Sequence, residues 1–189
     1  FPMISCYDEL LHAKRILHET YDSLNKEGLN CNNNVKMGIM IETPSAVILA
    51  DILSRDVDFF SIGTNDLVQY SLAVDRVNKK VAHLYQPLNP AIIRMIKHVA
   101  DVAKDKGVNL FMCGEMAGDP INIPILLGLG IEKLSINPQS IPVVKNIIKS
   151  SSYKMNRHLL ISGSSVRSRH GLSIKSSSYM HFAFFVQSS

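Results

Sequence analysis

Residues 35–62 read VKMGIMIETPSAVILADILSRDVDFFSI, and this stretch decides the fold. It contains a short apolar run from Val35 to Glu42, a helical pattern from Ser45 to Arg55 and a second apolar run from Val57 to Ile62. Runs that are apolar on both faces are typical of strands in a parallel sheet that helices cover. A helix between two such strands supplies the crossover that connects them. The stretch therefore predicts one strand–helix–strand unit.

The same unit recurs further along the chain. Helical and apolar patterns alternate over the remaining segments, which predict helices at 7–27, 90–106, 120–127 and 141–150 and strands at 108–112 and 133–136. Four strand-then-helix units in about 115 residues fit half of an eightfold β/α barrel, which needs about 250 residues. The expected fold is therefore α/β, half of a (β/α)8 TIM-type barrel. A doubly wound open sheet is the alternative.

The composition changes abruptly at Ser151. From there to the last residue the chain has five Lys or Arg, no Asp or Glu, and two clusters of serines. Residues 1–150 are therefore expected to form the barrel domain, and residues 151–189 a basic, Ser-rich tail that is disordered. The apolar end from Met180 to Val186 is unusual for such a tail, and a short strand is the alternative there.

Charge and cysteine content exclude several classes of function. The net charge of +4 comes from the tail, because residues 1–150 hold 15 basic and 16 acidic residues. Such a body lacks the clustered basic surface that nucleic-acid binding needs, and no apolar run approaches the roughly 20 residues of a membrane helix. Three cysteines without a CxxC pair favour a reducing compartment, the cytoplasm. The chain opens on Phe1 rather than Met, and we expect a piece of a longer protein.

Polar and reactive side chains follow each predicted strand, where the active sites of parallel β/α arrays are built. They are Glu42 after the first strand, Asn65 and Asp66 after the second, Cys113 and Glu115 after the third and Asn137 after the fourth. Glu42 and Asp66 would repel each other in one cavity unless a cation lay between them. Mg²⁺ suits such a place because it binds one or two carboxylates together with water and substrate oxygens. Helix capping or pairing with Lys is the alternative for these two acids.

Two further residues are candidates for chemistry. Cys113 follows an apolar strand, and a carboxylate at Glu115 would raise the pKa of the thiol, which favours a neutral proton donor over a thiolate. A small buried side chain is the alternative for Cys113. Arg76 lies in the long segment after Asp66 and could clamp a phosphate or a carboxylate. An internal ion pair with Asp75 or Asp66 is equally expected for Arg76.

Several ordered motifs resemble one family. They are GIMIETPSA (38–46), DFFSIGTNDL (58–67), AVDR (73–76), HLYQP (83–87) and MCGE (112–115), within a match that spans about residues 1–149. These strings resemble the phosphoenolpyruvate-protein phosphotransferase family, specifically the C-terminal half of its phosphoenolpyruvate-binding barrel. The opening Phe1-Pro2-Met3 resembles the preceding barrel strand.

The resemblance implies a reaction and its parts. Phosphoenolpyruvate (PEP) would phosphorylate a histidine of the same enzyme, and the phosphoryl group would pass to a small histidine-containing carrier protein of the sugar phosphotransferase relay. Glu42 and Asp66 match the family's Mg²⁺ ligands, Asn65, Asp66 and Arg76 its PEP contacts, and Cys113 the acid that protonates the enolate carbon. The family's barrel domain forms a homodimer. Its phosphorylated histidine lies in an upstream domain outside this sequence.

Two other functions stay open at this point. Pyruvate phosphate dikinases and phosphoenolpyruvate synthases share GTNDL-like and CGE-like segments, although the runs at Glu42 and Arg76 look more like the sugar-system enzyme. The chain could also act only as a catalytically inactive binding or dimerisation module, because the exposed edges of half a barrel invite association.

Overall fold

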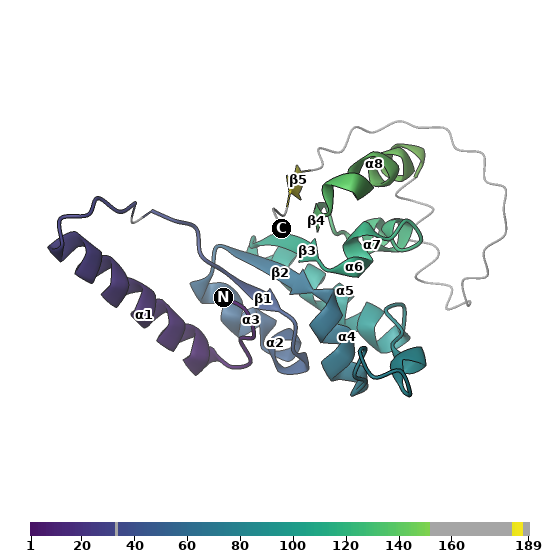
Figure 1. The fold of residues 1–189 in the computed structure, drawn as a ribbon, viewed down its shortest axis with the longest axis horizontal. Helices are drawn as coiled ribbons and strands as arrows, with labels where there is room; N and C mark the ends of the chain where they lie inside the picture. The colour runs from purple at the N-terminus through teal and green to yellow at the C-terminus, as the bar shows by residue number, and fades with distance from the viewer. Residues whose placement is uncertain (33, 152–182, 187–189) are drawn as a thin grey trace.

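A parallel sheet forms the centre of this computed structural model, which describes residues 1–32, 34–151 and 183–186 (Figure 1). Its strands follow one another in chain order: β1 (Gly38–Ile41), β2 (Phe59–Gly63), β3 (Asn109–Cys113), β4 (Lys133–Ile136) and β5 (Ala183–Val186). Every neighbouring pair is parallel. A doubly wound sheet reverses its strand order at a switch point. The sequential order is instead that of a β/α barrel, so the predicted half-barrel is confirmed.

The first residue continues this sheet beyond β1. The amino group of Phe1 donates to the carbonyl oxygen of Gly38 at 2.7 Å, and the carbonyl oxygen of Phe1 accepts from the backbone N–H of Met40 at 2.9 Å. One residue that bonds in this way to the two neighbours of its partner gives the pattern of a parallel ladder. The opening segment thus lies where the preceding barrel strand was expected.

Helices and 3₁₀ turns connect the strands and cover the sheet. They are α1 (Tyr7–Lys26), α2 (Pro44–Ile48), α3 (Ala50–Leu53), η1 (Ser54–Asp56), α4 (Thr64–Leu72), η2 (Ala82–Leu84), α5 (Pro90–Lys106), α6 (Glu115–Gly118), α7 (Ile123–Leu129), η3 (Pro138–Ser140) and α8 (Ile141–Ser150). The helix predicted at 45–55 is broken into α2, α3 and η1, with Leu49 at the junction. The helix α4 begins directly after β2, where no helix was predicted.

The core lies between the sheet and this helical layer. One row of side chains crosses four strands in register, from Ile41 to Ile62, Met112 and Leu134, and each is at most 1% exposed. Full burial of a side chain of this size stabilises the fold by about 1.5–3 kcal/mol. The next residues along the strands are Glu42, Gly63 and Cys113. The site therefore lies one residue beyond this row, at the C-terminal edge of the sheet.

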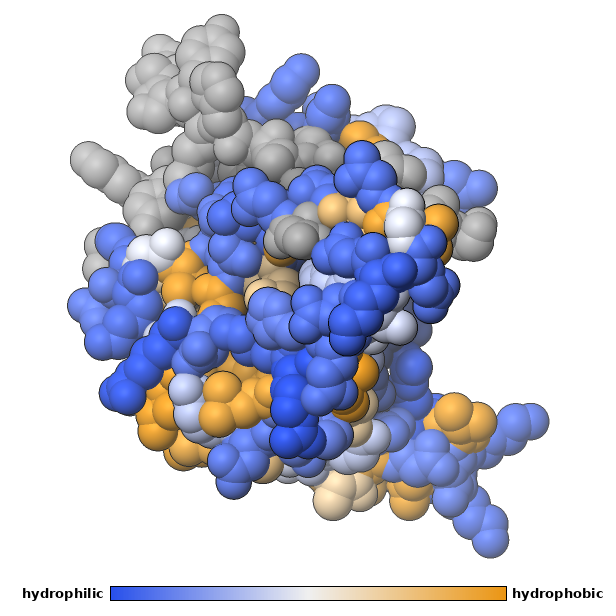
Figure 2. Space-filling model, turned by 90° about the vertical axis from the view of Figure 1, so that its left-hand side faces the viewer, coloured by the Kyte–Doolittle hydropathy of each residue, from blue (hydrophilic) through white to orange (hydrophobic). Residues whose placement is uncertain are grey.

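The outer surface near the N-terminus has exposed apolar side chains. Figure 2 shows hydrophobic patches among hydrophilic residues on this side of the molecule, and on α1 the side chains of Leu11 and Ile16 are nearly half exposed while Leu10 is fully buried. A closed barrel covers such surfaces with neighbouring helices. Half a barrel leaves part of its helical layer without them.

The tail is described at one place only. Ala183–Val186 forms β5 beside β4, with Lys133 opposite Ala183 and Ile136 opposite Val186. A strand at this apolar end was the alternative to disorder, and the structure adopts it. The rest of the tail predicted as disordered lies outside the described residues. Within those residues, no helix combines the length and apolarity that crossing a membrane would need.

Candidate functional site

The predicted site residues meet at the C-terminal ends of β1, β2 and β3. Glu42 follows β1, Cys113 is the last residue of β3, and Asn65 and Asp66 lie in the first turn of α4. Asn65 and Asp66 were predicted at the end of the second strand, with no helix there, whereas they belong to α4. The helix starts without a loop because Gly63 ends β2 and is also the residue before the first turn of α4.

Glu42 is held in a buried position. Among the residues that the structure describes it is the one buried charged group, at 2% exposed, and its Oε1 accepts the backbone N–H of Met3 at 2.7 Å. Space for the carboxylate depends on Gly63, because a Cβ there would lie 2.5 Å from Oε2 of Glu42. Met3 has a φ of 56°, a left-handed conformation that non-glycine residues rarely adopt. The backbone around Glu42 is therefore shaped to hold one carboxylate.

Glu42 and Asp66 form a pair of interacting carboxyl groups. Burial raises the pKa of Glu42, and the hydrogen bond from Met3 opposes this rise. Asp66 raises the pKa of Glu42 further, through its charge and through a hydrogen bond between the two side chains. Two neighbouring carboxylates behave in this way when no cation compensates their charge.

The residues present suit a cation that shares its coordination with a ligand. In the part of the chain that the structure describes, no three His, Cys, Asp or Glu side chains gather into a metal cage. Glu42 and Asp66 supply two carboxylates, the number that Mg²⁺ typically takes from protein before water and substrate oxygens complete its shell. The donor set therefore fits Mg²⁺ better than a metal with an all-protein shell.

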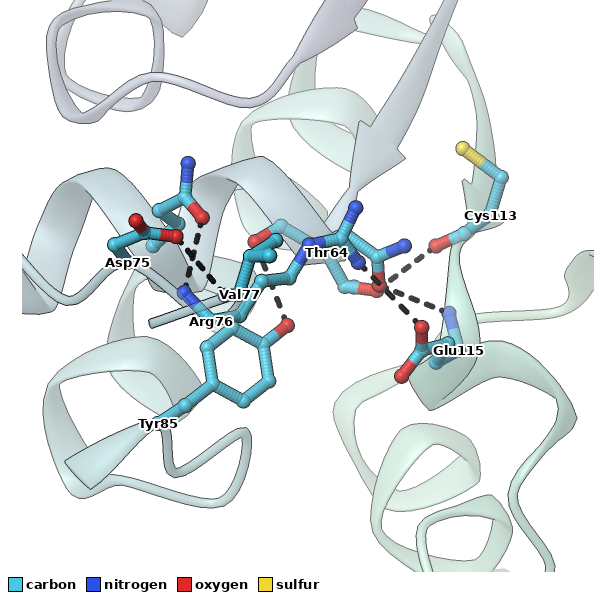
Figure 3. A network of polar contacts seen from close by, with 9 residues as sticks. Thr64, Asp75, Arg76, Val77, Tyr85, Cys113 and Glu115 are labelled. Atoms are coloured by element: carbon cyan, nitrogen blue, oxygen red, sulfur yellow. Dashed lines mark hydrogen bonds and ion pairs between the residues drawn. The ribbon is translucent and has the colours of Figure 1, made fainter. Parts of the chain in front are cut away.

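The surroundings of the Cys113 thiol favour its protonated form. Burial raises its pKa, a weak hydrogen bond from Ser61 opposes the rise, and the charges of Glu42 and Asp66 add to it. Its Sγ lies 3.5 Å from both the hydroxyl of Ser61 and the carbonyl oxygen of Ile62. The raised pKa agrees with the sequence prediction. The responsible carboxylates, however, are Glu42 and Asp66, whereas Glu115 was expected; the thiol points away from Glu115 (Figure 3).

A set of hydrogen bonds joins the end of β3 to the start of α4 (Figure 3). The hydroxyl of Thr64 donates to the carbonyl oxygen of Cys113 at 3.0 Å, and the N–H of Glu115 donates to Oδ1 of Asn65 at 3.1 Å. Gly114 between them has a φ of 90°, and a Cβ there would collide with the Thr64 hydroxyl. The close approach of the two segments therefore needs glycine at position 114.

Arg76 also reaches this place, from the loop after α4. Its Nη1 lies 3.4 Å from Oε1 of Glu115, across the top of the site. An ion pair with Asp75 or Asp66 was the alternative to ligand binding by Arg76, and the ion pair that the structure contains is with Glu115 instead. Asp75 accepts the backbone N–H of Val77 at 2.9 Å and so stabilises the turn that carries Arg76.

Some residues of the site were not found by sequence reasoning. Thr64, Gly63 and Tyr85 belong to it, since the hydroxyl of Tyr85 donates to the carbonyl oxygen of Asn65 at 3.4 Å. Thr64 and Gly63 stand beside Asn65 in the motif GTND, which was the signal available. The predicted candidate Asn137 caps η3 through the N–H of Gln139.

Two cavities open on the described part of the molecule. One, of about 440 Å³, adjoins the site and is lined by residues that include Asn65, Glu115, Asp119 and Asn137. The other, of about 390 Å³, lies at the opposite ends of β3 and β4 and contains none of the predicted site residues. Of the predicted candidates, Asn65, Glu115 and Asn137 line the first cavity, whereas Glu42, Asp66, Arg76 and Cys113 line neither.

Comparison with known proteins gives the family. A family profile described as "PEP-utilising enzyme, PEP-binding domain" matches residues 1–153. The chain belongs to this family. Relatives named phosphoenolpyruvate-protein phosphotransferase include those of Bacillus sp. (strain S), 52% identical over 141 residues, and Priestia megaterium, 49% identical over 152 residues. These matches cover 75% and 80% of this chain.

A third relative of the same name comes from Buchnera aphidicola subsp. Schizaphis graminum. It is 46% identical over 159 residues, or 84% of this chain. The aligned segments make up 24%, 26% and 28% of the three relatives. The PEP-binding domain described here thus spans about a quarter of the length of the relatives that it matches.

Proposed function

We propose that this PEP-binding domain supplies the PEP and Mg²⁺ site of a phosphoenolpyruvate-protein phosphotransferase. The phosphoryl group of PEP would pass to a histidine elsewhere in the whole protein, and from there to a histidine-containing phosphocarrier protein of the sugar phosphotransferase relay. The supporting observation is the convergence of Glu42, Asp66, Cys113 and Arg76 at one end of the sheet. The shared name of the relatives agrees with this assignment.

In this proposal, Glu42, Asp66 and the polar side chains near them bind PEP and Mg²⁺. Glu42 and Asp66 would hold Mg²⁺, which would supply positive charge against the negative charge of a phosphoryl group. The guanidinium of Arg76 and the side-chain amide of Asn65 bind the anionic groups of PEP. Phosphoryl transfer depends mainly on such positioning and charge compensation, because the protein forms little covalent chemistry with the group in flight.

Cys113 completes the reaction at the carbon end of PEP. When the bond between phosphorus and the enol oxygen breaks, its electron pair stays on that oxygen, and a new bond forms between phosphorus and the histidine nitrogen. The enolate then takes a proton at its terminal carbon from the Sγ of Cys113, which gives pyruvate and a thiolate. The raised pKa of Cys113 suits this step, because a donor must carry its proton at neutral pH.

The remaining parts of the proposal concern the whole protein. We place it in the cytoplasm, in line with three cysteines that are all free in the structure. The homodimer is what the resemblance to the phosphotransferase family implies. PEP-dependent phosphorylation of the carrier without ATP would distinguish this enzyme from a dikinase or a synthase.

The test is titration calorimetry of PEP into the full-length protein, with and without Mg²⁺. Asp66→Asn removes one carboxylate charge at nearly constant shape, and we expect at least a tenfold loss of Mg²⁺-dependent PEP affinity, or about 1.4 kcal/mol. Asp105→Asn is the matched control, because Asp105 is an exposed acid near the end of α5. Equal PEP affinity in the two variants would refute the assignment of Asp66.

A further inference from the structure

Arg76 is bound to a carboxylate that the proposed reaction does not use. The Nη1 of Arg76 lies 3.4 Å from Oε1 of Glu115; Arg76 lies in the loop after α4, and Glu115 is the first residue of α6. The backbone N–H of Glu115 is already engaged with Asn65, which fixes the start of its side chain beside the site. Because the backbone of Glu115 is fixed by this hydrogen bond, its carboxylate is held within reach of the Arg76 guanidinium.

This ion pair is weak enough to be displaced. The side chain of Glu115 is 80% exposed and that of Arg76 is 37% exposed, and a pair in such contact with water typically contributes about 0.2–1 kcal/mol. A ligand with a doubly charged phosphate group offers Arg76 a stronger partner than one exposed carboxylate does. The pair is thus suited to form in the empty site and to open when a phosphate arrives.

We infer that Glu115 is a competing counter-ion that lowers the affinity of this site for anions. The inference rests on the proposed function, since it takes PEP as the ligand of Arg76. Only those molecules in which the Arg76 guanidinium is free of Glu115 are competent to bind PEP. The apparent affinity for PEP is therefore the intrinsic affinity multiplied by the fraction of such molecules. Glu115 acts through Arg76 and is a specificity-determining residue: it favours ligands whose charge exceeds its own.

The experiment measures PEP affinity with Mg²⁺ in the full-length protein by calorimetry. Glu115→Gln keeps the backbone bond to Asn65 and removes the charge, and we expect PEP to bind roughly two- to sixfold more tightly, from the range for exposed pairs. The matched control is Glu132→Gln, which removes an equal charge from an exposed residue next to the start of β4. The control should leave PEP affinity unchanged.

A double-mutant cycle separates pairing from general charge repulsion. In the Arg76→Gln background, Glu115→Gln should give no gain, because there is no guanidinium left to release. The gain in the unaltered background should also shrink at about 1 M salt, where exposed ion pairs are screened.

The outcomes are distinct. An equal gain in the Arg76→Gln background would show plain electrostatic repulsion and overturn the inference, and so would weaker binding in Glu115→Gln, which would make Glu115 a direct ligand contact. Normal PEP binding by the unaltered protein with no gain in Glu115→Gln would overturn this inference alone. If the unaltered protein bound no PEP, the proposed function would fail, and the inference would fail with it.

Discussion

The hydroxyl of Thr64 donates to the backbone carbonyl oxygen of Cys113 at 3.0 Å and ties the first residue of α4 to the last residue of β3. Thr64 is 1% exposed and Cys113 is half-buried, so this bond is largely sheltered from water. The carbonyl belongs to the residue whose thiol is assigned as proton donor. Thr64 therefore fixes the backbone of Cys113 relative to the helix that carries Asn65 and Asp66.

Replacing Thr64 with Val should lower stability and slow the reaction. The change leaves the carbonyl oxygen of Cys113 without its partner, which costs about 1–3 kcal/mol of unfolding free energy. Thr20→Val is the control, because the Thr20 hydroxyl bonds to the carbonyl oxygen of Ile16 on an exposed helix face. Urea unfolding measures both variants. An equally small effect in the two would mean that the Thr64 hydroxyl contributes no buried bond.

Gly63→Ala should displace Glu42 and weaken Mg²⁺-dependent PEP binding. The added Cβ would lie 2.5 Å from Oε2 of Glu42 and 2.7 Å from Cε of Met40, and such overpacking costs about 1–3 kcal/mol. Gly118→Ala is the comparison, because its Cβ would meet no atom closer than 3.6 Å. Denaturant unfolding and PEP calorimetry should show losses for Gly63→Ala only. Retained PEP affinity in that variant would argue against a rigid carboxylate at position 42.

Cys113 should react slowly with alkylating agents at neutral pH. Burial raises the pKa of its thiol, so the thiolate that reacts is scarce until the pH becomes alkaline. Asp66→Asn removes one of the carboxylate charges that raise this pKa and should shift the pH profile of alkylation downward. Peptide mass spectrometry after timed iodoacetamide labelling gives the profile. If the inflection of the alkylation profile lay at or below the pH found for an ordinary cysteine, Cys113 could not have a raised pKa, and its role as proton donor would lose this support.

Cys113→Ala should separate binding from turnover. The side chain is assigned to proton transfer alone, so PEP affinity should stay within about twofold of the unaltered protein while pyruvate release falls by 10²- to 10⁴-fold, the usual contribution of a general acid. Cys31→Ala, in the loop before β1, is the control and should release pyruvate normally. Near-normal pyruvate release by Cys113→Ala would remove the residue from the mechanism.

The attachment of α1 should weaken in acid. Asp56 accepts the Tyr7 hydroxyl at 2.6 Å and the Lys14 ammonium at 3.1 Å, and these contacts lower its pKa below the usual 3.8. A carboxyl group with a lowered pKa stabilises the fold at neutral pH and loses that contribution as the pH falls below about 3.8. Hydrogen exchange over α1 should therefore accelerate in this range, and also at pH 7 in Asp56→Asn. Asp51 lies on the exposed side of α3, so Asp51→Asn should leave hydrogen exchange over α1 unchanged both in acid and at pH 7.

The sequence predicted the strands well because their apolar runs are bounded by polar residues. It missed α4 because Thr64, Asn65 and Asp66 are poor residues for a helix interior, and they follow an apolar strand without an intervening turn signal. At the start of a helix the same residue types are favourable, and α4 uses them there. Whether residues 64–66 extend the strand or start a helix depends on where β2 ends in the folded sheet, and a local sequence pattern does not contain that information.

The site was predicted in outline for a physical reason. Parallel strands bring their C-terminal ends to one edge, so the grouping of Glu42, Asp66 and Cys113 follows from the order of the elements. The pairing of Arg76 with Glu115 depends on the path of the loop after α4 and on the position where α6 begins, and no periodicity encodes either. The sequence could therefore list the acids near Arg76 without choosing among them.

The contact between Gly63 and Glu42 limits which substitutions can follow one another during evolution. A Cβ at position 63 would meet Oε2 of Glu42 at 2.5 Å, Cε of Met40 at 2.7 Å and Cβ of Glu42 at 2.9 Å. Shortening the acid at 42 to Asp would remove only the first of these clashes. Glycine is therefore expected to persist at position 63 even in variants that carry the shorter acid at 42.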